Sequence, residues 1–275
     1  MNTNAKTIMI TGTSSGIGRA AAEFFADNGW NVAATMRSPE RETELTRRDN
    51  VRVTALDVER ADTIETAVRR TVETFGRIDV LLNNAGYGTL GLFEASSDEQ
   101  IRRQFDVNVF GLMRVTQAVL PQMRRQGEGL ILNVSSMGGR IALPAMSLYH
   151  AAKFAVEGFS ESLAYELDSQ GIRVKLIEPG MVNTEFGGRS MELPSDPSLT
   201  AYQPYLDRTL AAFGAMSTPA NSLSPQDVAA AIYAAAADDS ARLRYPVGED
   251  AEAMLRLRAE RGDDDFRAQI RQTFA

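Results

Sequence analysis

The sequence contains no cysteine and only one histidine, His150. The lack of cysteine excludes disulfide bonds, a thiolate nucleophile and a thiolate metal site. Any redox chemistry must therefore come from a bound cofactor, and no metal site is predicted. Lysine is also scarce, because only Lys6, Lys153 and Lys175 stand among the 29 basic residues. A lysine inside a motif is more informative here than in an average sequence.

The sequence also lacks an excess of basic residues and any long apolar run. A net charge of −7 argues against nucleic-acid binding, which requires a basic face. No window reaches the roughly 18 apolar residues that a membrane span needs. Residues 1–6 lack the apolar core of a signal peptide. We therefore expect a cytoplasmic protein with no membrane span and no nucleic-acid partner.

Hydrophobic residues make up 44% of the 275 residues, which is enough for one large domain or two small ones. No linker or repeat divides the chain, so a single domain over 1–275 is expected. Short apolar runs predict strands at 7–11, 29–35, 52–56, 78–82, 129–136, 172–177 and 242–247. Helical periodicity predicts helices at 19–28, 61–75, 97–126, 149–169 and 226–237.

This alternation of strands and helices predicts an α/β fold, a three-layer, doubly wound parallel sheet of the Rossmann type. Its ligand crevice would lie at the carboxyl ends of the strands. Residues 185–224 interrupt the alternation with prolines and scattered apolar side chains, which indicates a mobile cover with short helices over an apolar substrate pocket. The charged segment 249–275 is expected to be a helical extension.

Tyr149 and Lys153 are four residues apart on a predicted helix, and therefore share one face. Of the seven tyrosines, only Tyr149 is followed by a lysine at this spacing. A phenol with a pKa near 10 needs a shift of about 3 units to act as a base at neutral pH. An ammonium about 4 Å away supplies nearly that much at an effective dielectric constant of about 20. The pair therefore predicts a proton-transferring tyrosine, against the alternative of a half-buried ring beside a solvated charge.

A glycine-rich turn, Gly12-Thr-Ser-Ser-Gly16-Ile-Gly18, separates the first strand from the first helix. Such a turn presents free amides and a helix N-terminus to a phosphate, although glycines also occur in simple turns. The same residues match the Gly-x-Ser-x-Gly nucleophile elbow of hydrolases around Ser14. A serine hydrolase would have to use His150, the only histidine. On the helix His150 points about 100° away from Tyr149, so we do not expect it to act with that tyrosine.

Arg37 follows the second strand, where dinucleotide-binding folds place either an acid or an arginine. An acid binds the ribose 2′-hydroxyl and an arginine accommodates a 2′-phosphate, so Arg37 favours NADP(H) over NAD(H). A solvated surface arginine is the alternative. Asp57 follows the third strand and would either accept a hydrogen bond from the adenine amino group or cap the next helix.

Two further features interrupt the regular pattern. Asn83-Asn84-Ala85-Gly86 follows the fourth strand and would let the backbone approach a flat ligand, or would form a simple turn. Asn108 lies inside the predicted helix 97–126, where asparagine competes with the backbone for hydrogen bonds. It indicates a kink with an exposed carbonyl, or a side chain that holds another group, or merely a solvated side chain.

In their order and spacing, these motifs resemble the short-chain dehydrogenase/reductase family over residues 7–247. The matching motifs are Thr11-Gly-x-x-x-Gly-Ile-Gly18, Asp57-Val58, Asn83-Asn-Ala-Gly86, Asn108, Ser136, Tyr149-x-x-x-Lys153 and Pro179-Gly180-x-Val182. Within the family, the residues around Tyr149 and the basic Arg37 look most like the branch of retinol and hydroxysteroid dehydrogenases.

The resemblance implies an NADP(H)-dependent interconversion of an alcohol and a ketone or aldehyde. Tyr149 would be the general acid/base, Ser136 would bind the substrate oxygen, Lys153 would lower the pKa of the tyrosine and bind the nicotinamide ribose, and Asn108 would hold a relay water. The family's serine lies 13 positions before the tyrosine, which selects Ser136 over Ser135. The implied cofactor-binding residues are Gly12, Ser14, Ser15, Gly16, Ile17, Gly18, Arg37, Asp57, Val58, Asn84, Ala85, Gly86, Tyr149, Lys153, Pro179, Gly180, Val182 and Thr184.

The family resemblance also implies a homodimer or homotetramer, formed through the helices around 98–126 and 149–169. Two other functions stay open at this point. A non-catalytic NADP(H)-sensing protein would keep the same residues without turnover. The serine hydrolase at Ser14 would leave Arg37, Asn108 and Lys153 without roles.

Overall fold

Seven short strands of mostly buried residues form one parallel sheet in the computed structural model, which describes residues 5–184, 190–216, 218 and 222–274. β1 and β2 are buried along their whole length, as expected for strands covered on both faces. The strands are β1 (Thr7–Thr11), β2 (Asn31–Met36), β3 (Val51–Ala55), β4 (Val80–Asn83), β6 (Gly129–Val134), β7 (Ile172–Pro179) and β9 (Arg244–Val247).

The strand order is β3-β2-β1-β4-β6-β7-β9. In this register Ile8 of β1 lies between Val32 of β2 and Val80 of β4, and Val80 lies opposite Leu130 of β6. The chain moves outward in one direction from β1 and in the other from β4, so the two central strands mark the topological switch point. Their carboxyl ends define the crevice in which this fold binds ligands.

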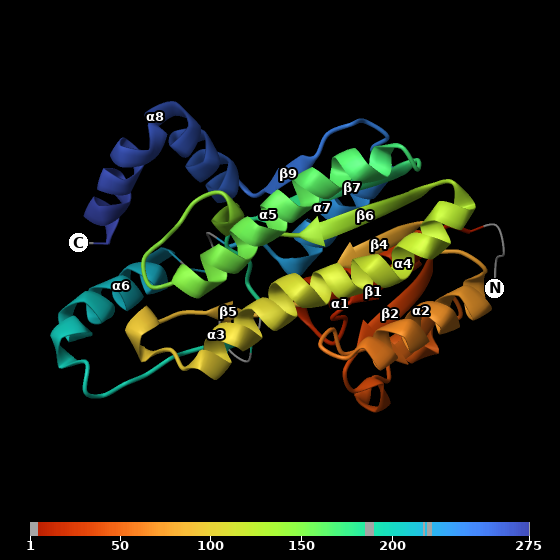
Figure 1. The fold of residues 1–275 in the computed structure, drawn as a ribbon, viewed down its shortest axis with the longest axis horizontal. Coiled ribbons are helices and arrows are strands. Elements are labelled where there is room, and N and C mark those ends of the chain that lie inside the picture. Colours follow the sequence, from red (N-terminus) through yellow and green to blue (C-terminus); the bar gives the residue numbers. More distant parts are fainter. Residues whose placement is uncertain (1–4, 185–189, 217, 219–221, 275) are drawn as a thin grey trace.

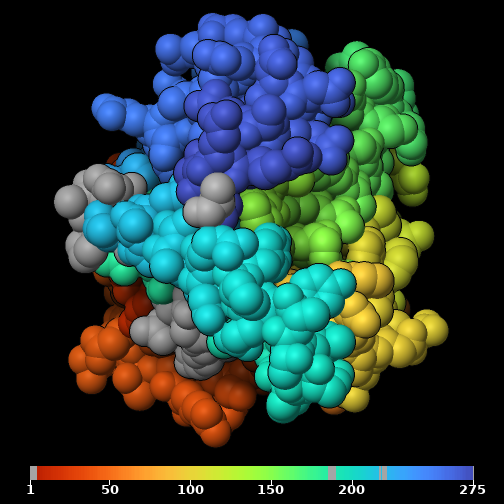
Figure 2. All heavy atoms as spheres, turned by 90° about the vertical axis from the view of Figure 1, so that its left-hand side faces the viewer, coloured from red at the N-terminus to blue at the C-terminus, as the bar shows by residue number. Residues whose placement is uncertain are grey.

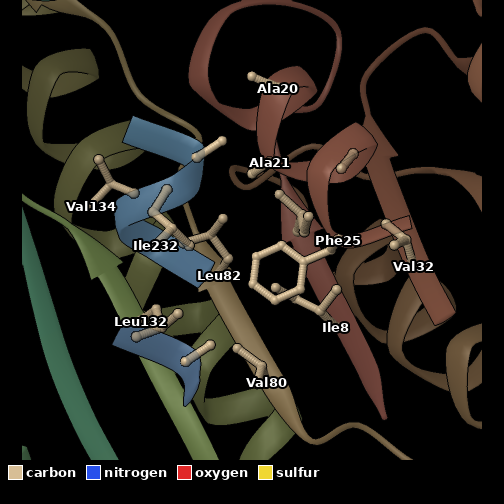
Figure 3. Packing of buried hydrophobic residues seen from close by; sticks show 14 of the residues in the cluster. Ile8, Ala20, Ala21, Phe25, Val32, Val80, Leu82, Leu132, Val134 and Ile232 are labelled. Atoms are coloured by element: carbon tan, nitrogen blue, oxygen red, sulfur yellow. The ribbon is translucent and has the colours of Figure 1, made fainter. Parts of the chain in front are cut away.

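Helices cover both faces of the sheet and make three layers (Figure 1). One face packs against α1 (Gly16–Asp27) and α7 (Pro225–Ala237), and the other packs against α2 (Ala61–Phe75), α4 (Leu112–Gln126) and α5 (Ser147–Asp168). On the face covered by α1 and α7, the fully buried Phe25 lies over Ile8, and Ile232 of α7 packs beside Leu82 and Leu132 (Figure 3). The single-domain, doubly wound parallel fold expected from the sequence is confirmed.

Several element boundaries differ from the sequence-based expectation. α5 begins at Ser147 rather than Tyr149, and β6 ends at Val134, so Ser135 and Ser136 follow the strand. The expected helix 97–126 is three pieces: α3 (Asp98–Phe105), the π-helical segment Asp106–Gly111, and α4.

Two contacts explain the break in this helix. The side chain of Asn108 hydrogen-bonds the backbone of Tyr87, and a Cβ at Gly111 would lie 2.7 Å from the Cγ2 of Val58. A π-helical turn is a common way to present a functional residue inside a long helix.

The insertion expected at 185–224 contains short elements where it is described. β8 (Met191–Glu192) pairs in parallel with β5 (Gly88–Thr89), which ties the insertion to the turn that follows β4. A 3₁₀ turn at Thr200–Tyr202 leads into α6 (Gln203–Met216). The short helices are as predicted, whereas the two-residue strands carry no periodicity and were not. Residues 185–189, 217 and 219–221 of the expected insertion lie outside the described residues.

The C-terminal segment forms α8 (Glu249–Thr273), as expected, with a kink at Gly262, where φ is 73°. The part of α8 that follows the kink joins the apolar cluster of Met137 and Phe213 through Phe266, Ile270 and Phe274. α8 and α6 therefore lie together over the carboxyl ends of the strands; Figure 2 looks onto this face, with α6 in cyan and α8 in dark blue. Among helices of the described segments, none has the length and apolar character required to cross a bilayer.

Candidate active site

The carboxyl end of β6 brings Ser136 and Tyr149 together. Ser136 is extended, with φ of −171°, and its hydroxyl accepts a hydrogen bond of 3.0 Å from the backbone N–H of Gly138. Tyr149, in the first turn of α5, is 8% exposed and shares a side-chain hydrogen bond with Ser136. Ser135 points elsewhere: it is 3% exposed and lies against Gly139. The structure thus pairs the tyrosine with Ser136.

Lys153 lies one turn beyond Tyr149 on α5 and is 9% exposed. Its ammonium donates a hydrogen bond of 2.8 Å to the carbonyl oxygen of Val134, the last residue of β6. The same Nζ lies 5.7 Å from the centre of the Tyr149 ring. The strand end therefore fixes the position of the amine, and the helical spacing fixes the phenol relative to it.

The acid-base properties of this pair differ from the sequence-based expectation. Burial raises the pKa of Tyr149 to about 12, and the hydrogen bond with Ser136 acts in the opposite direction. Burial lowers the pKa of Lys153 to about 8, and Glu157 acts against that change. The prediction that Lys153 alone shifts the phenol toward neutral pH is wrong in this structure. The reason is that the ring is desolvated while the ammonium is directed at Val134.

Asn108 uses both ends of its side chain. Its Oδ1 accepts a hydrogen bond of 3.0 Å from the N–H of Tyr87, and its Nδ2 donates one of 2.7 Å to the carbonyl oxygen of Tyr87. A Cβ at Gly86 would lie only 2.8 Å from the same Oδ1. The expected interruption of the helix is therefore confirmed, and the Asn108 side chain holds the backbone just beyond Gly86.

The glycine-rich turn fits a diphosphate. Gly12 has φ of 73°, and a Cβ there would lie 3.0 Å from the Cα of Ala85. A Cβ at Gly18 would overlap the carbonyl oxygen of Gly12. α1 begins at Gly16, where φ is 57°, so its free N-terminal amides face this turn. Backbone packed this closely at a helix N-terminus is suited to bind an anion.

The residues around the turn are held from two sides. Asn84 Nδ2 donates to the carbonyl oxygens of Thr11 and Gly12, at 2.9 and 3.1 Å. The hydroxyl of Thr11 in turn accepts hydrogen bonds from the N–H groups of Asn84 and Ala85, both at 3.0 Å. The side chain of Asn84 therefore shapes the turn itself. Ser14 is exposed, whereas Ser15 and Ile17 are half-buried.

Arg37 and Asp57 lie after neighbouring strands, β2 and β3. Arg37 is exposed immediately beyond Met36. Asp57 Oδ1 accepts a hydrogen bond of 3.1 Å from the N–H of Glu59, while the cap of α2 is Arg60. The interpretation of Asp57 as a helix cap is therefore wrong, and its binding of adenine stays a prediction.

The last group of expected cofactor residues borders the same crevice. Val58 is buried against Gly111, and Thr184 lies 3.6 Å from where a Cβ of Gly16 would stand. Pro179 ends β7. A Cβ at Gly180 would overlap the carboxylate of Asp250, and Val182 forms a parallel bridge with Leu223. The structure thus gathers the residues expected from the sequence around one sheet edge.

His150 belongs to the framework of the site. Its Nε2 accepts a hydrogen bond of 2.9 Å from the N–H of Leu143, and its Nδ1 lies 2.8 Å from the carbonyl oxygen of Gly138. Burial lowers the pKa of the ring. Since both ring nitrogens bind backbone groups, neither is left to activate Ser14 as a hydrolase requires.

Sequence reasoning missed a group of buried polar residues behind the site. Thr11 was predicted to end a strand and to begin the glycine motif, but its hydroxyl was given no role, although it holds the asparagine turn. Glu157, one turn after Lys153, is 5% exposed, and Glu178, near the end of β7, is fully buried. An acidic residue inside an apolar helical stripe was a signal that could have identified Glu157.

Comparison with known proteins gives consistent relatives. A family model described as short chain dehydrogenase matches residues 6–193. An uncharacterized oxidoreductase of Schizosaccharomyces pombe is 40% identical over 242 residues, 86% of this chain and 98% of the relative. A 3-ketodihydrosphingosine reductase of Bacteroides thetaiotaomicron is 40% identical over 179 residues, 65% of each chain. The human 17-beta-hydroxysteroid dehydrogenase type 1 is 33% identical over 271 residues, 92% of this chain and 80% of the relative.

Solved structures resemble the whole chain. A short-chain dehydrogenase from Streptomyces avermitilis superposes with a TM-score of 0.84 at 34% identity, covering 98% of this chain and 96% of that one. An alcohol dehydrogenase from Thermococcus sibiricus complexed with 5-hydroxy-NADP has a TM-score of 0.72 at 26% identity, with coverage of 89% and 97%. A short-chain dehydrogenase/reductase from Burkholderia phymatum in complex with NAD has a TM-score of 0.77 at 26% identity, with coverage of 98% and 96%.

Proposed function

Because this chain belongs to the short-chain dehydrogenase family of oxidoreductases, we propose that it interconverts an alcohol and a ketone or aldehyde with NADP(H) as the cofactor. One observation carries the proposal: a buried phenol, Tyr149, is hydrogen-bonded to Ser136 at the carboxyl end of a central strand, with the amine of Lys153 one turn away. NADP(H) supplies the hydride in reduction and accepts it in oxidation.

In the proposed reaction, Tyr149 transfers the proton at the substrate oxygen and Ser136 binds that oxygen. At neutral pH the Tyr149 phenol holds the proton that reduction delivers to the carbonyl oxygen. Burial raises its pKa to about 12 and so makes it a weaker acid than a free phenol, and donation therefore depends on groups that stabilise the phenolate left behind. Alcohol oxidation requires the opposite step, for which the phenolate must be stabilised by positive charge. Lys153 is the cation within reach of the ring, and Asn108 would hold the water of the relay.

The glycine turn and its neighbours would hold the cofactor. Gly12, Gly16 and Gly18 would bind the diphosphate, Asp57 the adenine, and Lys153 the nicotinamide ribose. The tight backbone at Gly18 and the N-terminus of α1 support the first assignment.

The preference for NADP(H) rests on Arg37. Its exposed guanidinium stands directly after β2, where this fold binds the adenine ribose. The relatives leave the preference open, because one solved structure contains an NADP derivative and another contains NAD.

An apolar substrate, as in the retinol and hydroxysteroid branch, is supported by the cover above the site. Met137 follows Ser136 directly and belongs to one apolar cluster with Phe213 of α6 and Phe274 of the C-terminal helix. Phe213 and Phe274 are in edge contact, with ring centres 5.1 Å apart. We therefore assign residues 185–224 as a substrate lid and 249–275 as its support. The names of two relatives, a 3-ketodihydrosphingosine reductase and a hydroxysteroid dehydrogenase, agree with a lipid-like substrate.

The decisive experiment measures NADPH consumption by the purified protein with ketones, aldehydes, sterols, retinoids and sugars. Tyr149→Phe should lower kcat by roughly 100- to 10,000-fold, because it removes the proton donor, while NADPH binding survives. Tyr165→Phe is the matched control, since that tyrosine is on the same helix and 78% exposed. Turnover retained by Tyr149→Phe would overturn the assignment. A protein that binds NADPH but consumes no carbonyl would instead be the non-catalytic sensor.

The proposal includes a cytoplasmic location and a homodimer or homotetramer. Large apolar side chains exposed on the helices that the family resemblance assigns to subunit contacts support the assembly. Phe110 is 48% exposed, Phe154 is 45% exposed, and Tyr165 is the most exposed of the three.

A further inference from the structure

A buried carboxylate lies directly behind the proposed reacting groups. Glu157 follows Lys153 by one turn of α5 and is 5% exposed. Glutamate is rarely buried unless it is paired, because an ionised carboxyl group loses its hydration in the protein interior. The residues of the same helix that precede and follow it in the core are largely apolar, as for Val156 and Leu163. Glu157 therefore needs a specific explanation.

Glu157 is fixed in place by the turn that follows Ser136. A Cβ at Gly139 would lie 2.6 Å from the Oγ of Ser135 and 2.8 Å from the Cγ of Glu157. Glu157 Oε2 accepts a hydrogen bond of 2.9 Å from the Nε of Arg244 on β9. Glu157 Oε1 has no hydrogen-bond partner within the described part of the chain. One oxygen of the Glu157 carboxylate is thus bonded to Arg244, and the other makes no hydrogen bond within the described residues.

Glu157 belongs to a cluster of charged groups that also contains Arg244, Glu178, Arg140 and Glu161 of its own helix. Arg244 also approaches Glu178 of β7, with Nε 3.5 Å from Oε1, and donates to Glu161 of α5 at 2.5 Å. Arg140, after the turn, lies 3.4 Å from Glu178 Oε2. Burial raises the pKa of Glu178 to about 7, and the charge of Glu157 acts in the same direction. Glu157, held by Arg244, lies one turn from Lys153 on the same face of α5.

The group within reach of this negative charge is the ammonium of Lys153. Burial lowers the pKa of Lys153 to about 8, and Glu157 is the charged group that works against this loss. Lys153 and Glu157 form no ion pair within the segments described here, so the attraction acts through the protein interior. There the screening is weaker than in water, and a single charge has a longer reach.

We propose that Glu157 is a positioning residue of the reaction: its buried carboxylate, fixed between the Ser136 turn and Arg244, keeps the ammonium of Lys153 charged. The inference rests on the proposed function for its catalytic meaning, because only a charged Lys153 stabilises the phenolate of Tyr149. The effect of Glu157 on the charge of Lys153 does not depend on turnover. The protonation of Lys153 and the rate of the reaction are therefore measured separately.

The scarcity of lysine makes a direct measurement practical. Lysine-selective isotope labelling and NMR would show Lys6, Lys153 and Lys175, assigned with Lys→Arg variants. In Glu157→Gln the titration midpoint of Lys153 should fall by about one pH unit. The midpoints of the exposed Lys6 and the buried Lys175 should not move. Glu161→Gln is the matched control, because it removes the other carboxylate of α5 that binds Arg244 and should leave Lys153 unchanged.

Two further variants keep the test decisive. Glu157→Asp retains the charge and should restore most of the midpoint. Glu178 ionises more readily once Glu157 is neutral, so the double variant Glu157→Gln/Glu178→Gln should show a larger fall than the single one. A Lys153 midpoint in Glu157→Gln equal to that of the unchanged protein overturns the inference. So does an aspartate variant that behaves like the glutamine variant.

The kinetic consequence is measured separately. In alcohol oxidation the high-pH limb of kcat/KM should move down by about one unit in Glu157→Gln, because Lys153 loses its proton earlier. KM for NADP+ should change little. If the NMR midpoint moves while the unchanged protein turns over no alcohol, the proposed function fails and the role of Glu157 toward Lys153 stands. If the unchanged protein is active and the high-pH limb of kcat/KM does not move in Glu157→Gln, the positioning role is refuted.

Discussion

Arg37 is the residue through which we propose that the protein selects its cofactor. It is exposed directly after β2, and its guanidinium offers the donors that a 2′-phosphate requires. The position of the strand end could be predicted from the sequence to within one residue. In this proposal, the selection between two nucleotides that differ by one phosphate depends on the single charge of Arg37.

Arg37→Asp should reverse the preference from NADP(H) toward NAD(H). A lost charge-assisted hydrogen bond of about 1.5–3 kcal/mol corresponds to a change of roughly 10- to 150-fold in the ratio of kcat/KM values. Arg41→Asp is the control, because Arg41 lies in the same loop with an 86% exposed side chain. An unchanged ratio in Arg37→Asp would remove this residue from the cofactor site.

Glu178 gives the protein a pH-dependent stability. Its pKa is raised from 4.5 to about 7, first by burial and then by Glu157. The folded protein binds this proton more tightly than the unfolded chain does. The resulting stabilisation is complete below pH 4.5 and is lost as the pH rises through about 7. We expect the Tm of the protein relative to Glu178→Gln to fall across this interval, whereas exposed Glu166→Gln should show no such trend. A constant Tm difference would contradict the prediction.

Sequence reasoning placed the proposed reacting residues on one helix face but did not give their environment. The spacing of Tyr149 and Lys153 was enough to place both on one face of α5. It could not show that Lys153 donates to Val134, because that contact depends on where β6 ends relative to the helix. The pKa of Tyr149 was predicted in the wrong direction for the same reason, since burial is a property of the packed protein.

The helix α6 of the proposed lid and the C-terminal helix α8 pack against each other. Phe213 of α6 meets Phe274 at the end of α8, inside the cluster that contains Met137. The kink at Gly262 makes this contact possible, because it turns the second half of α8 back toward α6 (Figure 1). Arg258 stabilises the turn by pairing with Asp263 at 2.8 Å.

Phe213→Ala and Phe274→Ala should each raise the KM for an apolar carbonyl by about three- to tenfold, since an aromatic pair contributes about 0.5–1.5 kcal/mol beyond its buried area. The Kd for NADPH should stay nearly constant, because both rings belong to the cluster around Met137 rather than to the glycine turn. Leu210→Ala tests the specificity of the effect, as Leu210 is on α6 but 43% exposed. Equal losses of substrate and cofactor affinity would argue against a lid.

The elements that the sequence did not predict have weak local signals. β5 and β8 are two residues each, and their pairing joins segments about a hundred positions apart in the chain, so no periodicity announces them. The π-helical segment was anticipated only as a kink at Asn108. Its form depends on the contact between Gly111 and Val58, which the sequence alone cannot reveal.

For the whole molecule, the sheet order follows from the alternation of strands and helices together with the right-handed crossover rule. The short apolar strands and amphipathic helices therefore predict the architecture well. The sequence leaves the subunit arrangement undetermined, because a surface aromatic reads the same in a monomer and in an oligomer. Exposed Phe154 and Tyr165 on α5 are the side chains on which the proposed contact rests.

Phe154→Glu should shift the protein toward monomers, because it places a charge in the proposed apolar contact between subunits. Light scattering after size-exclusion chromatography measures the mass. Phe93→Glu is a suitable control: Phe93 is also exposed, at 59%, but lies before α3 and outside the helices expected to pair. An identical mass for the unchanged protein and Phe154→Glu, at any concentration, would refute an interface through α5.

The first turn of α8 is bonded to the loop that follows β7. Asp250 accepts a hydrogen bond of 2.7 Å from the N–H of Met181, and its carboxylate fills the space beside Gly180 that a side chain would need. A change in the loop after Pro179 should therefore also alter the start of the C-terminal helix. Amide hydrogen exchange in residues 249–254 would then report on nucleotide occupancy from outside the crevice, without a label near the chemistry.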